Sequence, residues 1–340
     1  MSTTHAHDSL PGPESTTRRA RAAGSARRPV TGPAATLLAA SVARRYYMDG
    51  ASKSDIAAEF GISRFKVARV LDGARNSGLV RIELNYEGDI DLGLSMELGE
   101  RYGLRRCLVI DSADDEAALR SNLGRIAAGL LSEVVTADDV VGLAWSRTLL
   151  AMRSSLRHLP PCTIVQLTGA LSLPDVDESS IELVRDVARI ASGPAYWFYA
   201  PMILPEPGSA SSLRAQTQVA RAFDRFDDLT KAIVSLGAWD RSQSTVADAM
   251  SDTEYEELVR LGACAELCGV QLDAEGNPLQ TTLSHRIVGI GADQLRAVPE
   301  IIATAYGRPK ARAVRAVIRG GFVSTLITHV SLAEELLRLQ

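Results

Sequence analysis

Basic side chains and one aromatic ring are concentrated in residues 63–76, SRFKVARVLDGARN. The segment contains four cations and a single acid: Arg64, Lys66, Arg69, Arg75 and Asp72. On a helix its apolar residues share one face, and Phe65 and Arg69 lie on the opposite face. Arg and Lys donate to guanine O6 and N7, and an aromatic ring can contact a thymine methyl group. The pattern predicts a helix that reads double-stranded DNA; a helix that only packs in a larger core is the alternative.

Two later segments, 142–148 and 307–310, have the chemistry of a site for a small anion. Each is expected to join a strand to a helix, where small residues leave backbone N–H groups and a helix N-terminus open to a ligand. Lys310 is one of only 4 lysines in the chain, against 33 arginines. An ammonium at this place suits a phosphate as a point charge. A solvated charge at the helix end is the alternative, but the helix dipole disfavours a cation there.

The elements around residues 63–76 have the spacing of a helix-turn-helix. A helical pattern starts at Thr36 and ends at Gly50, and a second helix follows a capping arrangement of Ser52 and Asp55. Gly61 suits the turn, and Ser63 suits the cap of the next helix. Residues 79–84, LVRIEL, alternate apolar and polar positions and predict a strand or wing.

Charge and composition divide the 340 residues into parts. We predict a disordered basic tail at 1–34, a DNA-binding domain at 35–85, a linker at 86–95 and an effector-binding domain at 96–340. Residues 1–86 hold 13 Lys and Arg and 7 Asp and Glu, a net charge of +6; the remainder holds 24 and 34, a net charge of −10. This asymmetry indicates that only the first part contacts phosphates.

The second domain alternates apolar strands with amphipathic helices. Strands are predicted at 107–111, 140–144, 163–167, 232–236, 300–305 and 324–328. Such alternation is typical of a mainly parallel sheet with helices on both faces, an α/β fold. Apolar runs are too short for a membrane span, and the amino end is no secretory signal, so a cytoplasmic location is expected with no membrane partner. The four cysteines are expected to be buried thiols.

The chain resembles the SorC-type sugar-binding transcriptional regulators of bacteria over residues 37–338. The resemblance rests on residues 46–84 and on four later segments: VGLAWSRT (141–148), VQLTGA (165–170), GACAEL (262–267) and ATAYGRPKA (303–311). It implies a winged helix-turn-helix followed by an α/β sensor domain like that of sugar-phosphate isomerases and deaminases. It also implies operator DNA as a partner, a sugar or polyol effector that is commonly phosphorylated, and a homodimer or homotetramer.

The resemblance and the motifs together predict which residues bind DNA and which bind the effector. For DNA they are Lys53, Ser63, Arg64, Phe65, Lys66 and Arg69. For the effector they are Gly142, Ala144, Ser146, Arg147, Thr148, Gln166, Glu266, Tyr306, Gly307 and Lys310. Glu266 stands where the family usually has Asp and is expected to bind sugar hydroxyls, with a surface charge as the alternative.

Three positions depart from the family pattern: Ser146 and Tyr306 replace small residues, and His329 replaces an Asp. An effector without a phosphate is therefore an alternative. A second alternative is an active isomerase- or deaminase-like enzyme fused to a DNA-binding domain. Such an enzyme needs an acid and a base near the phosphate, and only His329 among the five histidines follows a predicted strand. We therefore expect no catalysis, and no cofactor or metal.

Overall fold

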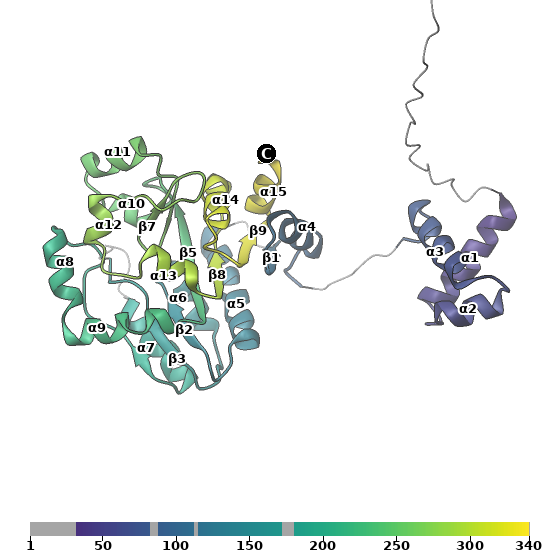
Figure 1. Ribbon diagram of the computed structural model, residues 1–340, viewed down its shortest axis with the longest axis horizontal. Helices are drawn as coiled ribbons and strands as arrows, with labels where there is room; N and C mark the ends of the chain where they lie inside the picture. The colour runs from purple at the N-terminus through teal and green to yellow at the C-terminus, as the bar shows by residue number, and fades with distance from the viewer. Residues whose placement is uncertain (1–31, 82–87, 112–114, 172–179, 340) are drawn as a thin grey trace, which may run out of the picture. The chain divides into compact units, whose positions relative to one another are not determined.

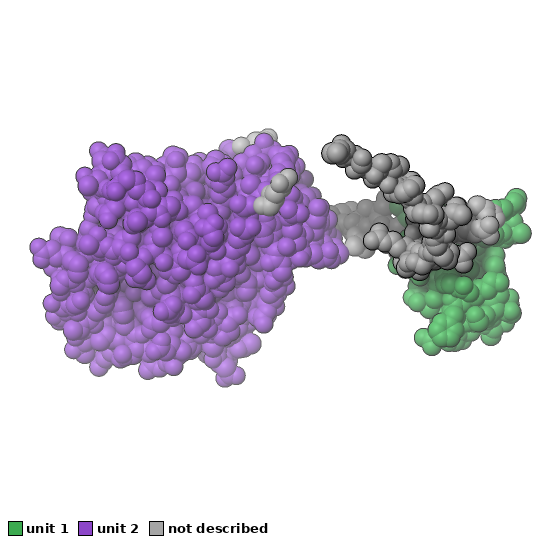
Figure 2. All heavy atoms as spheres, turned by 45° about the horizontal axis from the view of Figure 1, so that its top comes forward, with its two compact units in different colours: residues 1–85 green, residues 86–340 purple. Residues whose placement is uncertain are grey.

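The computed structural model describes residues 32–81, 88–111, 115–171 and 180–339. Contacts divide the chain into two compact units, Met1–Asn85 and Tyr86–Gln340 (Figure 2). In the described residues no helix is long and apolar enough to cross a membrane.

The first unit is a three-helix domain formed by α1 (Pro33–Tyr47), α2 (Lys53–Glu59) and α3 (Arg64–Asn76). Val42, Ile56, Val67 and Leu71 form its core, as the helical spacing predicted. The Ser52 hydroxyl accepts from the Asp55 N–H in a complete capping box, and the Ser63 hydroxyl accepts from the Lys66 N–H at the start of α3. These caps fix where α2 and α3 begin.

The ends of this domain differ in part from expectation. Helix α1 begins at Pro33, inside the segment predicted as a tail, because proline suits the first turn of a helix. Residues 1–31 lie outside the described residues. Of the predicted wing, residues 79–81 carry no strand, and 82–84 are not described.

The second unit is built on a sheet in the order β1-β9-β8-β5-β2-β3-β4, in which every neighbouring pair is parallel. Its strands are β1 (Arg106–Ile110), β2 (Val140–Leu143), β3 (Thr163–Gln166), β4 (Ala195–Tyr196), β5 (Lys231–Ala238), β8 (Glu300–Thr304) and β9 (Thr325–His329). An antiparallel hairpin, β6 (Ala265–Leu267) and β7 (Val270–Leu272), continues from the end of β5. The six predicted strands are all present; β4, β6 and β7 had not been predicted.

Helices cover both faces of this sheet (Figure 1). One layer contains α5 (Glu116–Val134), α6 (Arg147–Ser155) and α7 (Ser180–Ala191), and the other contains α4 (Leu92–Tyr102), α14 (Ala311–Arg319) and α15 (Val330–Arg338). Helix α4 begins inside the segment predicted as a linker. The predicted α/β fold with a mainly parallel sheet is confirmed.

Shorter helices surround the carboxyl ends of the strands and the sheet's margins. They are α8 (Pro207–Arg214), α9 (Thr217–Phe223), η1 (Phe226–Asp228), α10 (Thr245–Asp248), α11 (Asp252–Arg260), α12 (Thr282–Arg286), α13 (Ala292–Ala297) and η2 (Arg308–Lys310). Strands β8, β5 and β2 are neighbours in the sheet although they are distant in the chain, and their carboxyl ends lie together. In open parallel sheets this edge is where ligands bind.

Candidate functional site

A cavity of about 560 Å³ lies at the carboxyl ends of β2, β5 and β8 and extends to the β6–β7 hairpin. Eight of the ten residues predicted for the effector line it: Ala144, Ser146, Arg147, Thr148, Glu266, Tyr306, Gly307 and Lys310. The two segments singled out for anion chemistry therefore meet in one pocket, as parallel strand ends must when their strands are close in the sheet.

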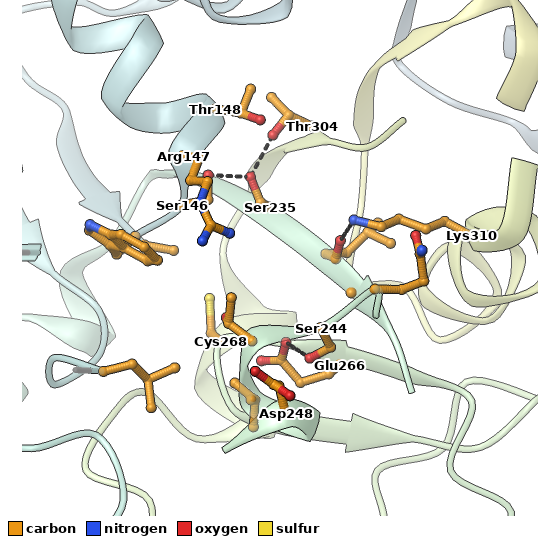
Figure 3. Close-up of a pocket in the computed structure, with 18 of the residues that line it drawn as sticks. Ser146, Arg147, Thr148, Ser235, Ser244, Asp248, Glu266, Cys268, Thr304 and Lys310 are labelled. Carbon is orange, nitrogen blue, oxygen red and sulfur yellow. Dashed lines mark hydrogen bonds between the residues drawn. The ribbon is translucent and has the colours of Figure 1, made fainter. Parts of the chain in front are cut away.

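Three hydroxyl groups form a row across one wall of the cavity (Figure 3). The Ser146 Oγ lies 2.7 Å from the Ser235 Oγ, which lies 2.6 Å from the Thr304 Oγ1. Ser146 also caps α6, because its Oγ accepts from the Leu149 N–H at 3.1 Å. Each hydroxyl comes from the end of a different strand, so the row depends on the order β8-β5-β2.

The opposite side of the cavity is acidic and includes Glu266, Ser244 and Asp248 (Figure 3). The Glu266 carboxylate is buried; it accepts from the Gly269 N–H at 2.6 Å and from the Ser244 hydroxyl at 3.5 Å. Burial raises the pKa of Glu266 to about 7 despite these two donors. The carboxyl group can therefore exchange a proton near neutral pH while it accepts hydrogen bonds from a ligand.

Lys310 acts on this carboxylate through its positive charge. Its Nζ donates to the Leu236 carbonyl at 3.2 Å and lies 5.3 Å from the centre of the Tyr306 ring. Burial lowers the pKa of Lys310, and the charges of Glu266 and Glu116 act against that shift. Lys310 is therefore not the solvated charge considered as its alternative.

Tyr306 links the cavity to α5. Its hydroxyl donates to the Glu116 Oε1 at 3.1 Å, and Arg120 donates to the same oxygen at 2.9 Å. Burial raises the pKa of the Tyr306 phenol, which keeps it a hydrogen-bond donor. Tyr306 is one of the residues that line the pocket.

Gly142 and Gln166 do not line the cavity. Gly142 lies inside β2, where an added Cβ would come within 2.6 Å of the Leu167 side chain. The fully buried Gln166 amide donates to the Thr168 carbonyl at 2.8 Å and accepts from the Phe198 N–H at 3.1 Å. Both residues support the strand ends that form the pocket.

Several lining residues were not predicted, among them Ser235, Ser244, Arg241 and Thr304. Ser235 and Thr304 could have been found in the sequence because each is a polar residue at the end of an apolar strand. His329 caps α15 through a contact of its Nδ1 with Ser331 and is not among the lining residues.

In the first unit, α3 presents the side chains that were predicted to contact DNA. Arg64, Phe65, Lys66 and Arg69 are exposed, with Phe65 83% exposed, while Val67 and Leu71 face the core. Arg75, by contrast, pairs with Asp72 at 2.5 Å. Ser63 acts as the cap of α3, and the half-buried Lys53 lies 5.6 Å from the Tyr46 ring. The exposed face of α3 therefore has one apolar side chain, Phe65, with positively charged side chains around it.

Metal-ligating side chains occur in the described part of both units. Among the described residues, no three His, Cys, Asp or Glu side chains are placed to hold a metal ion. Burial raises the pKa of the Cys268 thiol in the pocket, which opposes its use as a nucleophile.

Comparison with known proteins places these units in context. Residues 86–338 match the family model described as a putative sugar-binding domain. The chain is 31% identical over 304 residues to the uncharacterized transcriptional regulator YjhU of Escherichia coli, covering 86% of this chain and 92% of that protein. It is 24% identical to the sorbitol operon regulator of Klebsiella pneumoniae, covering 88% and 98%.

Solved structures show the same fold. The crystal structure of the full-length sorbitol operon regulator SorC from Klebsiella pneumoniae superposes with a TM-score of 0.69 at 22% identity, covering 90% of this chain and 100% of that one. A domain of a possible sugar-binding transcriptional regulator from Arthrobacter aurescens gives a TM-score of 0.66 at 20% identity, covering 75% and 99%.

Proposed function

Because the chain belongs to the SorC-type family of sugar-binding transcriptional regulators, we propose that it binds operator DNA through α3 and a carbohydrate-type effector in the cavity of its α/β unit. Effector binding controls the affinity for DNA. The observation that carries this proposal is the cavity itself, which brings Ser146, Glu266 and Lys310 from three distant segments to one place. Hydroxyl, carboxylate and ammonium groups are the partners that a sugar or polyol needs.

The DNA-binding part of the proposal is supported by the surface of α3. Arg64, Lys66 and Arg69 are exposed beside Phe65, at the amino end of the second helix of the helix-turn-helix. Residues at this end of a recognition helix contact base edges in the major groove. Ser63 and Lys53 would support the contact at the start of α3 and of α2.

A single helix-turn-helix covers few base pairs, so operators are read by symmetric pairs of subunits. The protein therefore acts as a homodimer or homotetramer, held mainly by the α/β unit, and it acts in the cytoplasm, where the operator is. Light scattering at micromolar concentration tests the assembly, and a monomer both with and without DNA would contradict it.

The regulator has no enzymatic activity in this proposal. The residues that line the cavity include no histidine, and burial raises the pKa of the lining thiol Cys268, which opposes its use as a nucleophile. Incubation with sugar phosphates and analysis of the products tests this point, because turnover would favour the enzyme alternative.

The main experiment is a thermal-shift screen of sugars, polyols and their phosphates with the full-length chain. A ligand at 100 times its dissociation constant stabilises the folded state by about 2.7 kcal/mol. Glu266→Gln and Lys310→Met should each reduce the shift, whereas the exposed Glu275→Gln should not. No shift with any member of the screen would contradict the proposed effector class.

A further inference from the structure

The row of hydroxyls formed by Ser146, Ser235 and Thr304 has one consistent direction of hydrogen bonding. Three contacts must be made with three protons: Ser146 with Ser235, Ser235 with Thr304, and Thr304 with the Val234 carbonyl at 3.4 Å. A carbonyl only accepts, so Thr304 donates to Val234. Ser235 must then donate to Thr304, and Ser146 to Ser235.

The reverse direction is less favourable. If Thr304 donated to Ser235, its only proton would be used and the contact with Val234 would be lost. The Ser146 oxygen already accepts from the Leu149 N–H, as a helix cap does. Its proton is therefore available for Ser235, which agrees with the first direction.

In this direction all three hydroxyl protons are used inside the protein. Each oxygen has two lone pairs and accepts one internal hydrogen bond: Ser146 from Leu149, Ser235 from Ser146, and Thr304 from Ser235. One lone pair on each oxygen is left for a ligand. The row itself therefore offers a ligand three acceptors and no donor.

A phosphate ester does not match a row of acceptors. At neutral pH its terminal oxygens are mainly acceptors and carry about −1.5 to −2 charge. A ligand hydroxyl matches it, because a hydroxyl donates one hydrogen bond and still accepts others. A second hydroxyl of a polyol can donate to the Glu266 carboxylate, and a hydroxyl oxygen can accept from the Lys310 ammonium across the cavity (Figure 3).

The cations of the cavity also have partners. Arg120 pairs with Glu116 at 2.9 Å, and Arg241 pairs with Asp252 at 2.8 Å. Lys310 donates to the Leu236 carbonyl and faces Glu266. Arg147 also has an interaction within the protein. To bind Arg120 or Arg241, a dianion would have to compete with Glu116 or Asp252, whereas an uncharged ligand leaves these two pairs intact.

We propose that the cavity selects an uncharged polyhydroxylated molecule, a sugar alcohol or free sugar, over its phosphate ester, and that the row Ser146–Ser235–Thr304 makes this selection. The inference rests on the proposed effector site and narrows its ligand class. It contrasts with the phosphorylated effector that the family resemblance implies.

Matched pairs of ligands test the proposal on the full-length chain. Erythritol, ribitol and sorbitol are compared with erythritol 4-phosphate, ribitol 5-phosphate and sorbitol 6-phosphate by thermal shift and calorimetry, with inorganic phosphate as a further probe. At least one polyol should bind at least tenfold more tightly than its own monophosphate. Tighter binding of the monophosphates would contradict the proposed selectivity for uncharged polyols but would still support the proposed effector site. Binding by neither class contradicts the proposed function as well.

Variants test whether the hydroxyl row makes the selection. Thr304→Val keeps the side-chain shape, and Ser235→Ala removes the central hydroxyl. Each variant should bind the polyol about tenfold more weakly, which is the scale of one lost hydrogen bond. Each should also show a smaller preference for the polyol over its monophosphate. Ser211→Ala, exposed on α8, is the control and should bind as the parent chain does. The two variants differ in volume change, so a folding defect in one leaves the other informative. Unchanged preference in a folded Thr304→Val or Ser235→Ala chain overturns the role of the row.

Discussion

The Glu266 carboxylate and the Lys310 ammonium line the same cavity and affect each other's ionisation, yet no ion pair joins them among the described contacts. Each is instead held by a backbone group: the Gly269 N–H for Glu266 and the Leu236 carbonyl for Lys310. Because both groups line the cavity, a ligand hydroxyl can donate to the Glu266 carboxylate, and a hydroxyl oxygen can accept from the Lys310 ammonium.

The first prediction concerns pH. The pKa of Glu266 is about 7 in the folded chain and 4.5 as its ordinary value. Between these values the folded chain holds a proton that the unfolded chain has released. The free energy of unfolding should therefore fall as pH rises through this window, by at most about 3 kcal/mol.

Urea unfolding of the ligand-free chain between pH 4.5 and 8 measures this effect. Glu266→Gln, which keeps an acceptor for the Gly269 N–H, should remove that part of the pH dependence and be more stable than the parent chain at pH 8. Lys310, Asp248 and Cys268 share the cavity and stay unchanged in the variant. A parallel pH profile for both chains would contradict the assignment; Glu275→Gln, an exposed position, is the control.

The second prediction concerns α3. Arg64→Ala and Arg69→Ala should each weaken binding to the operator by about 1–3 kcal/mol without loss of stability, because both side chains are exposed. Arg75→Ala serves as the matched control, since Arg75 is engaged by Asp72. Operators selected from a random pool by the parent chain provide the DNA for the titrations. Equal affinity of all four proteins would exclude α3 as the reading helix.

The third prediction concerns the packing that places α6, and with it Arg147 and Thr148, at the cavity. A Cβ on Gly124 of α5 would lie 2.5 Å from the Met152 backbone nitrogen of α6. Gly124→Ala should therefore destabilise the fold by about 1–3 kcal/mol through overpacking. Gly129→Ala on the same helix meets nothing within 4 Å and should stabilise by up to about 1 kcal/mol. Denaturant unfolding compares the two, and the same sign of change in both would refute this account of the α5–α6 contact.

The sequence predicted much of this architecture because local patterns determine it. Caps at Ser52 and Ser63, the helical stripe of α3 and the six long apolar strands are each encoded within a few consecutive residues. The short strands β4, β6 and β7, of two or three residues each, are too brief for a periodic signal.

The hydroxyl row could not be predicted in the same way. Ser146, Ser235 and Thr304 are about 70 to 160 positions apart, and they meet only because β5 lies between β2 and β8. Strand order is a property of tertiary packing, and no local sequence pattern predicts it. For the same reason Gly142 and Gln166, which stand close to lining residues in the sequence, face the interior of the fold and not the cavity.

The most direct test of the central claim is a DNA titration with and without the effector found by the screen. For the parent chain, saturating effector should change operator affinity by about 5- to 150-fold, the usual range of allosteric coupling. Lys310→Ala should bind the operator normally without effector and should show no response at the concentration that saturates the parent chain. An operator affinity of the parent chain that is the same with and without saturating effector would contradict the account, because a ligand that binds both states equally cannot regulate.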